Sequence, residues 1–245
     1  MSVTINNKFI NNPITYKKKL PAFYMTEYNK AEQFFPYAPY DYNVLADVIK
    51  RRLLSKYPRD ESVKIIKETY KYFSAGKKVT ENIELLKNNN TLAIVTGQQP
   101  DLMTGPLYII YKALSAVRLA DILNEKFSEY KFVPIFWTAS DDHDIEEMNQ
   151  FALLDQENNF KKFSFNIKAE RVPAYRIDFK RQDVFELADF LKNNLRPSEY
   201  TERLINELKE VFTRTLNLNQ LFILLMQRLF DDFGLIIIDG SNANL

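Results

Sequence analysis

The sequence predicts an α/β fold built on a sheet of parallel strands. Three short apolar runs each stop at a polar or glycine-containing segment, as buried strands do: Leu92–Val95, Phe132–Thr138 and Leu235–Ile238. A stretch of helical periodicity separates the first two runs, which makes a strand–helix–strand unit. Between Asn149 and Ile167 the period falls to two, which predicts an inserted β-hairpin.

The elements follow in order along four predicted segments. Residues 1–90 form an arm and helices that pack on the core, with helical pattern from Val44 to about Asn90, broken at Pro58 and near Gly76. Residues 91–148 form the first strand–helix–strand unit. Residues 149–197 form an inserted hairpin and helical subdomain. Residues 198–245 form a long helical segment to Phe233, closed by Gly234, and a return strand.

The helix of the strand–helix–strand unit begins at Pro106, because proline is favourable in the first turn. It runs to about Phe127. Its apolar residues recur at helical spacing and predict one buried stripe: Leu107, Ile110, Tyr111, Leu114 and Val117.

Composition excludes several classes of protein. The 245 residues include 33 basic and 32 acidic side chains, so a net charge of +1 gives no attraction to nucleic acid or an anionic membrane. There is no cysteine, which excludes disulfides and thiolate zinc sites, and a zinc site built on one histidine is not expected. No signal peptide or membrane span is evident, so we expect a cytoplasmic protein.

Ligands of parallel sheets bind outside the carboxyl ends of the strands. Three such ends are available, and we expect them to share one edge of the sheet. They are followed by the segments Thr96–Pro106, Ser140–Asp144 and Asp239–Ser241.

The first loop, Thr96–Pro106, predicts a nucleotide or substrate site. Gly97 would permit backbone angles closed to other residues, and Gly105 would let a ligand approach the start of the helix, where anions are favoured. The alternative is a tight turn with solvent-facing glutamines. Neither a P-loop nor a GxGxxG pattern is present. The candidate binding residues are Thr96, Gly97, Gln98, Gln99, Thr104 and Gly105, with Asp239 from the third strand end.

The second loop places three carboxylates around the single histidine and predicts the catalytic group: Asp141, Asp142, His143 and Asp144. The imidazole could move a proton, and Asp141 and Asp142 could hold Mg²⁺ at a nucleotide phosphate. The alternative is that Ser140, Asp141 or Asp142 caps a helix beginning near Ile145.

Both loops resemble the signatures of the bacillithiol-biosynthesis cysteine-adding enzymes, the BshC family. The similar segments are Val95–Pro100, Thr104–Tyr108, Tyr111–Ala113 and Pro134–Glu147, with Phe34–Tyr37 in the N-terminal arm. The chain departs from the signatures at Asp101, where the family usually has glycine, and at Asp141, where glutamate is usual.

The resemblance implies a Rossmann-type core, a coiled coil and a homodimer. It also implies a reaction that joins the carboxyl group of L-cysteine to the amine of glucosaminyl malate. Because a free carboxylate needs activation, we infer ATP or another nucleotide. The alternatives are a non-catalytic nucleotide- or metabolite-binding protein and a related aminoacyl or nucleotidyl transferase.

Family members are considerably longer than this chain, and the resemblance places their coiled coil and remaining strands beyond Leu245. We therefore expect the last strand, Leu235–Ile238, to lack a covering helix. An uncovered apolar face and a bare sheet edge would promote non-specific association.

Overall fold

The computed structural model describes residues 19–38, 44–167, 171–215 and 217–242, so the first 18 residues of the predicted arm lie outside it. The chain divides into two compact units, Met1–Lys56 and Tyr57–Leu245. The first unit holds three short helices, α1 (Lys19–Thr26), α2 (Tyr28–Ala31) and α3 (Leu45–Leu53).

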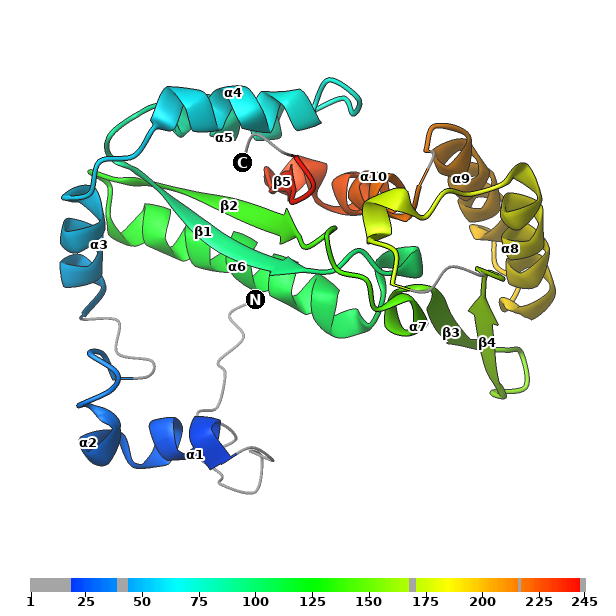
Figure 1. The fold of residues 1–245 in the computed structure, drawn as a ribbon, viewed down its shortest axis with the longest axis horizontal. Coiled ribbons are helices and arrows are strands. Elements are labelled where there is room, and N and C mark those ends of the chain that lie inside the picture. Colours follow the sequence, from blue (N-terminus) through cyan, green and yellow to red (C-terminus); the bar gives the residue numbers. More distant parts are fainter. Residues whose placement is uncertain (1–18, 39–43, 168–170, 216, 243–245) are drawn as a thin grey trace. The chain divides into compact units, whose positions relative to one another are not determined.

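The second unit is built on three parallel strands in the order β1-β2-β5 (Figure 1). These strands are β1 (Thr91–Gln98), β2 (Lys131–Thr138) and β5 (Ile236–Asp239), and α6 (Leu107–Lys126) connects the first two. The predicted α/β class and strand–helix–strand unit are therefore confirmed.

Helices cover both faces of this sheet. On one face, Phe136 of β2 and Ile237 of β5 join a large apolar core with α6 and α10 (Leu218–Phe230). On the other face, Ile135 and Ile236 pack with α4 (Arg59–Thr69) and α5 (Lys77–Leu85). Figure 1 shows α6 on the side of the sheet opposite to α4 and α5.

The last strand is covered, contrary to our expectation. Leu235, Ile236 and Ile237 are at most 1% exposed, and Ile238 is 8% exposed. Because α10 packs on one face and α4 and α5 pack on the other, no further helix is needed to bury these side chains. The prediction of a bare apolar face at this strand is wrong. The expected sheet edge is present, since β5 is the outer strand of the described sheet, and non-specific association stays a prediction.

A tyrosine of the helical region also forms a hydrogen bond with the outer edge of β5. The backbone N–H of Ile237 donates to the hydroxyl of Tyr70 at 2.8 Å. An N–H at the edge of a sheet otherwise depends on water or on another chain for its hydrogen bond. Tyr70 therefore joins the segment after α4 to the sheet.

Tyr70→Phe should lower the free energy of unfolding by about 1 kcal/mol, because the Ile237 N–H loses its acceptor while the ring stays in place. Urea denaturation followed by circular dichroism measures the change. Tyr72→Phe is the matched control, since Tyr72 is 79% exposed. Equal stabilities for the two variants would contradict this role for the hydroxyl.

The buried face of α6 differs from the predicted stripe. Val117 is buried and Ile110 is half-buried, but Leu107, Tyr111 and Leu114 are exposed. The face turned to the core instead carries Ile109, Ala113, Ala116, Val117, Ala120 and Leu123. Three of these residues are alanines, whose small side chains allow the helix to lie close to the strands.

The first strand is also less buried than its apolar sequence indicates. It is an edge of the three-stranded sheet, and Ala93 and Val95 on one face are exposed, Val95 by 62%. The prediction of a fully buried strand is therefore wrong for β1 and right for β5.

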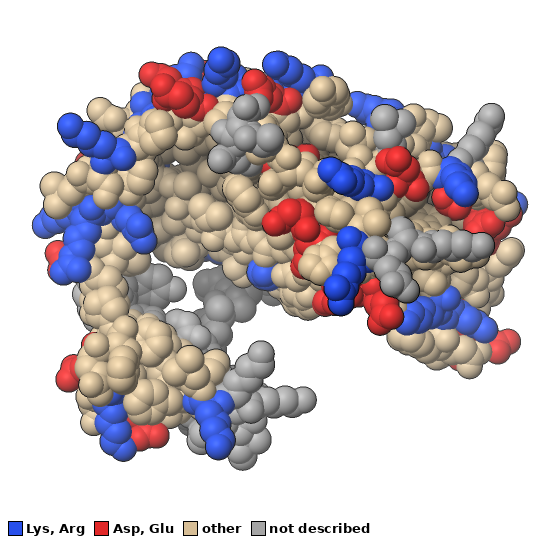
Figure 2. Space-filling view, in the orientation of Figure 1, with Lys and Arg blue, Asp and Glu red and all other residues tan. Residues whose placement is uncertain are grey.

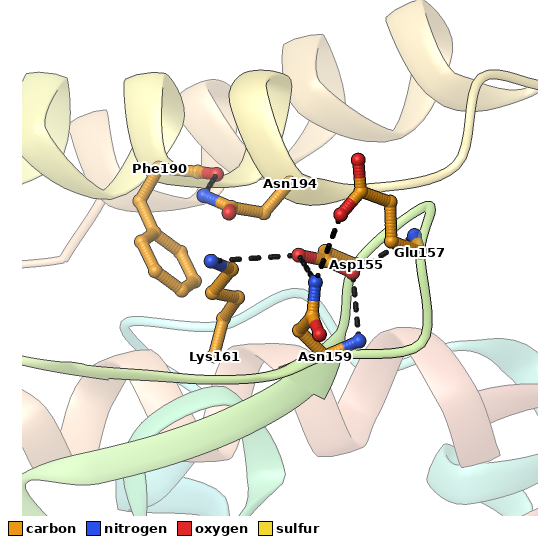
Figure 3. Close-up of polar contacts among 6 residues, drawn as sticks. All are labelled: Asp155, Glu157, Asn159, Lys161, Phe190 and Asn194. Atoms are coloured by element: carbon orange, nitrogen blue, oxygen red, sulfur yellow. Dashed lines mark hydrogen bonds and ion pairs between the residues drawn. The ribbon is translucent and has the colours of Figure 1, made fainter.

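The predicted hairpin is present as antiparallel strands β3 (Gln150–Leu154) and β4 (Phe160–Ser164). Its turn is organised by Asp155, as Figure 3 shows. One carboxyl oxygen of Asp155 accepts from the backbone N–H groups of Glu157 and Asn159 at 2.9 and 2.8 Å, and Lys161 lies 3.4 Å from the other. These bonds hold the turn of the predicted hairpin.

The predicted long helical segment after Ser198 is two helices, α9 (Thr201–Thr213) and α10. The side chain of Asn217 caps α10 by accepting from the N–H of Gln220 at 2.9 Å. A further helix, α8 (Arg181–Asn194), precedes them, and 3-10 turns occur at Leu102–Thr104, Ala174–Arg176 and Asp231–Phe233. Gly234 is left-handed, as expected for a residue that ends a helix.

In the described part of the chain, no helix combines the length and apolar character that a membrane crossing requires.

Candidate functional site

The carboxyl ends of the three parallel strands meet in one row, as predicted. Gln98 pairs in register with Thr138, and Thr138 pairs with Asp239. The segments that leave the strands stay attached: the N–H of Ala139 donates to Gln98, and the N–H of Gly240 donates to Thr138, both at 3.0 Å. Polar residues from three strands therefore share one edge of the sheet.

The first three residues of the predicted binding loop belong to β1. Thr96, Gly97 and Gln98 are half-buried in the strand rather than in a loop. Gly97 is not in the left-handed region, which corrects the reason given for it. A Cβ at Gly97 would lie 2.5 Å from the carbonyl oxygen of Trp137 on β2, so the glycine is required by the close approach of two strands.

Lys112 on α6 is a further candidate for the site that the sequence prediction missed. Its Nζ donates to the carbonyl oxygen of Gly97 at 2.5 Å and to Oε1 of Gln98 at 2.9 Å. No carboxylate forms an ion pair with it in the described part of the chain. A half-buried ammonium group beside the carboxyl end of β1 can therefore attract an anionic ligand. Its position near the start of the helix that follows the loop could have indicated from the sequence that Lys112 lies at the site.

The hydrogen bonds extend from Lys112 through Gln98 to Gln99. Nε2 of Gln98 donates to Oε1 of Gln99 at 3.2 Å. Gln99 is only 9% exposed, and its own Nε2 has no partner among the described residues. A buried donor without an acceptor is costly, and a ligand oxygen would satisfy it. The alternative of solvent-facing glutamines is thus wrong for Gln99.

Asp101 is the most unusual residue of the first loop. It is 1% exposed, and neither carboxyl oxygen has a hydrogen-bond partner among the described residues. Burial, followed by the negative charges of Glu147, Asp142 and Asp144, raises its pKa from 3.8 to about 7. These neighbours show that the first and second loops converge at Asp101.

The turn that follows Asp101 is strained. Met103 and Thr104 have φ angles of 55° and 68°, positive values that residues other than glycine rarely adopt. Gly105 has a φ of 68° with a ψ of −158°, a combination almost restricted to glycine. A Cβ there would lie 2.5 Å from a carboxyl oxygen of Asp101. Gly105 is therefore required both for its backbone angles and for contact with Asp101.

The second loop is partly a helix cap. Oδ1 of Asp144 accepts from the N–H of Glu147 at 3.2 Å and caps α7 (Ile145–Met148), so the cap is Asp144 and not an earlier residue. Asp142 accepts from the N–H of His143 at 2.7 Å. Asp141 and His143 are exposed, and the imidazole has no hydrogen bond to any described residue.

The proposed Mg²⁺ ligands Asp141 and Asp142, completed by a nucleotide phosphate, stay a prediction. Within the described ranges, no group of three or more histidine or acidic side chains is placed to hold a metal ion. Asp141 and Asp142 therefore offer no preformed cage.

The third strand end is well organised. Oδ1 of Asp239 accepts from the hydroxyl groups of Ser140 and Ser241, both at 2.8 Å, and from the N–H of Ser241 at 2.9 Å. Ser140 is fully buried. These bonds tie the start of the second loop to the end of β5. Figure 2 shows acidic side chains near the carboxyl ends of β1 and β2.

Comparison with known proteins places this chain in a family. Residues 8–245 match a family model described as the N-terminal Rossmann-like domain of bacillithiol biosynthesis BshC. The chain belongs to the BshC family.

Curated relatives carry the name "Putative cysteine ligase BshC". The protein of Carboxydothermus hydrogenoformans is 33% identical over 234 residues, which cover 93% of this chain and 42% of the relative. Those of Chloroherpeton thalassium and Flavobacterium johnsoniae are 34% and 35% identical, each covering 75% of this chain and 33% of the relative. The chain thus spans well under half the length of these BshC relatives.

Proposed function

We propose that this chain supplies the Rossmann-like part of a cysteine ligase. The reaction would join the carboxyl group of L-cysteine to the amine of glucosaminyl malate, with ATP or another nucleotide as the activator. The name of the relatives supports the ligase, and the row formed by Gln98, Thr138 and Asp239 supports the place of the site. That row lies where ligands of parallel sheets bind.

The residues of the carboxyl edge fit an anionic activator. When bound, a nucleotide would transfer a phosphoryl or nucleotidyl group to the carboxylate oxygen, which turns that oxygen into a leaving group. Lys112 would attract the phosphates, assisted by the positive end of α6. The buried Nε2 of Gln99 would donate to a ligand oxygen. Thr96 and Thr104 are half-buried in the same region.

The second loop would contribute to proton transfer. The amine must lose a proton when it forms the amide, and the exposed imidazole of His143 would receive it from a bound substrate. Mg²⁺ does not fit a preformed protein cluster here, so no step is assigned to it. The cytoplasmic location, the homodimer and the coiled coil remain predictions.

Thiol analysis of a strain that lacks the gene tests the ligase. We expect bacillithiol to be absent and glucosaminyl malate to accumulate, because only the amide-forming step is lost. A gene carrying Lys112→Met should fail to restore the thiol. Arg118→Met, which removes an exposed cation from the same helix, should restore it. Unchanged thiols in the deletion strain would reject the proposed reaction in favour of a binding protein or another transferase.

A further inference from the structure

The loop Asp101–Gly105 holds a buried carboxyl group for which the described residues provide no partner. Asp101 is almost fully buried, and neither oxygen accepts a hydrogen bond. Buried carboxylates in proteins are normally paired with a cation or with several N–H donors. The absence of such a partner in the described part of the chain is the observation that needs an explanation.

The surroundings of Asp101 favour a cation over any other ligand. Asp142, Asp144 and Glu147 all lie close enough for their charges to act on Asp101. Tyr108, in the first turn of α6, is also near, since the charges of Asp101 and Glu147 act on its hydroxyl. A group placed among these residues meets negative charge from both loops, so an anion would be repelled and an ammonium group attracted.

The chain itself does not bring a cation to this position. Each of the ion pairs between described residues joins other side chains, and Lys112 is directed to Gly97 and Gln98. Lys112 therefore defines an anion-attracting position, and Asp101 defines a cation-attracting position. Lys112, on α6, contacts Gln98 at one end of the Gln98–Asp101 stretch, and Asp101 is the other end.

We propose that Asp101 binds the primary ammonium group of a substrate, with Glu147, Asp142 and Asp144 as the surrounding negative charges. Because Asp101 is buried, the neighbouring turn Leu102–Thr104 would have to move to admit the ligand. Met103 and Thr104 have positive φ angles, which makes the backbone conformation of this turn costly in free energy. Movement of the turn on ligand binding would relieve part of that cost. The ligand class is a small primary amine.

Two amines are the natural probes, and this choice rests on the proposed function: L-cysteine and D-glucosamine. Each has an N-acetyl form that cannot carry the positive charge, although the acetyl group also makes it larger. Titration calorimetry on the full chain should show that at least one of the amines binds, and that its N-acetyl form binds at least about tenfold more weakly. The amine that binds identifies the source of the ammonium group.

Asp101→Asn should lower the affinity for the bound amine by at least about tenfold and leave the weak binding of the N-acetyl form unchanged. Asp121→Asn, which removes an exposed carboxylate of α6, should bind as the unmodified chain does. Asp101→Ala is the second variant and must show the same loss, with folding of each variant checked by circular dichroism.

Equal affinity of the unmodified chain and the two Asp101 variants would overturn the inference, as would equal binding of an amine and its N-acetyl form. Binding of neither amine at millimolar concentration would also overturn it. These results are separate from the thiol analysis. Loss of amine binding in Asp101→Asn can occur in a protein that proves not to be a ligase, and a working ligase can prove to ignore Asp101.

Discussion

Gly97→Val should destabilise the second unit by roughly 2–4 kcal/mol, because the added side chain has no room between two paired strands. Gly97 faces Trp137 in the register of β1 and β2. A Cβ on Gly97 would lie 2.5 Å from the carbonyl oxygen of Trp137 and 3.1 Å from its Cβ. Both neighbours are fixed by the sheet, so the strands must separate at their carboxyl ends.

Urea denaturation measures this effect, and Ala93→Val is the matched control. Ala93 lies in the same strand but is exposed, and valine is well suited to strands, so the control should change stability by less than about 0.5 kcal/mol. If Gly97→Val were as stable as Ala93→Val, the close approach of the strands would not be the reason for the glycine.

The same geometry changes how a loss of ligand binding in Gly97→Val must be interpreted. From the sequence, Gly97 was expected to permit backbone angles closed to other residues at the start of a binding loop. In the structure the room for a side chain at Gly97 is taken by β2, and the next residue, Gln98, accepts from Lys112 and donates to Gln99. Any loss of binding would therefore follow from displacement of Gln98 and its partners, not from an obstructed ligand.

The element order and the position of the site were predictable because each depends on short-range patterns. Apolar runs mark the strands, and parallel strands bring their carboxyl ends together whatever lies between them. The row Gln98–Thr138–Asp239 follows directly from that rule. The break between α9 and α10 was also detectable, since Asn217 followed by Gln220 is a helix-capping pattern.

The remaining errors concern contacts between distant segments. The helix α6 has apolar residues on two faces, and periodicity cannot decide whether Leu114 or Ala113 meets the sheet. The cover of β5 comes from α4, which lies far earlier in the chain. The burial of Asp101 and the partners of Lys112 likewise depend on contacts between segments. Residue type alone therefore did not distinguish these two side chains from solvated loop and helix residues.

The unmodified chain should lose stability between about pH 4 and pH 7, and Asp101→Asn should remove this part of the loss. Burial, then the charges of Glu147, Asp142 and Asp144, raises the pKa of Asp101 from 3.8 to about 7 in the folded chain. Between these two values the folded state holds a proton that the unfolded state has released. Stability from this group is therefore complete below pH 4, falls as the pH rises, and is gone above pH 7.

The linkage amounts to about 1.4 kcal/mol per pH unit, or roughly 4 kcal/mol over the whole window. Urea unfolding at pH 5 and pH 8 measures it as the difference between the unmodified chain and Asp101→Asn, because contributions from other groups largely cancel in that difference. At pH 8 the variant should be the more stable protein, and at pH 5 its advantage should shrink by roughly 3 kcal/mol. For the exposed Asp121→Asn the difference from the unmodified chain should be the same at both pH values. A similar constancy for Asp101→Asn would mean that this carboxyl group titrates normally and is not buried among the charges of the second loop.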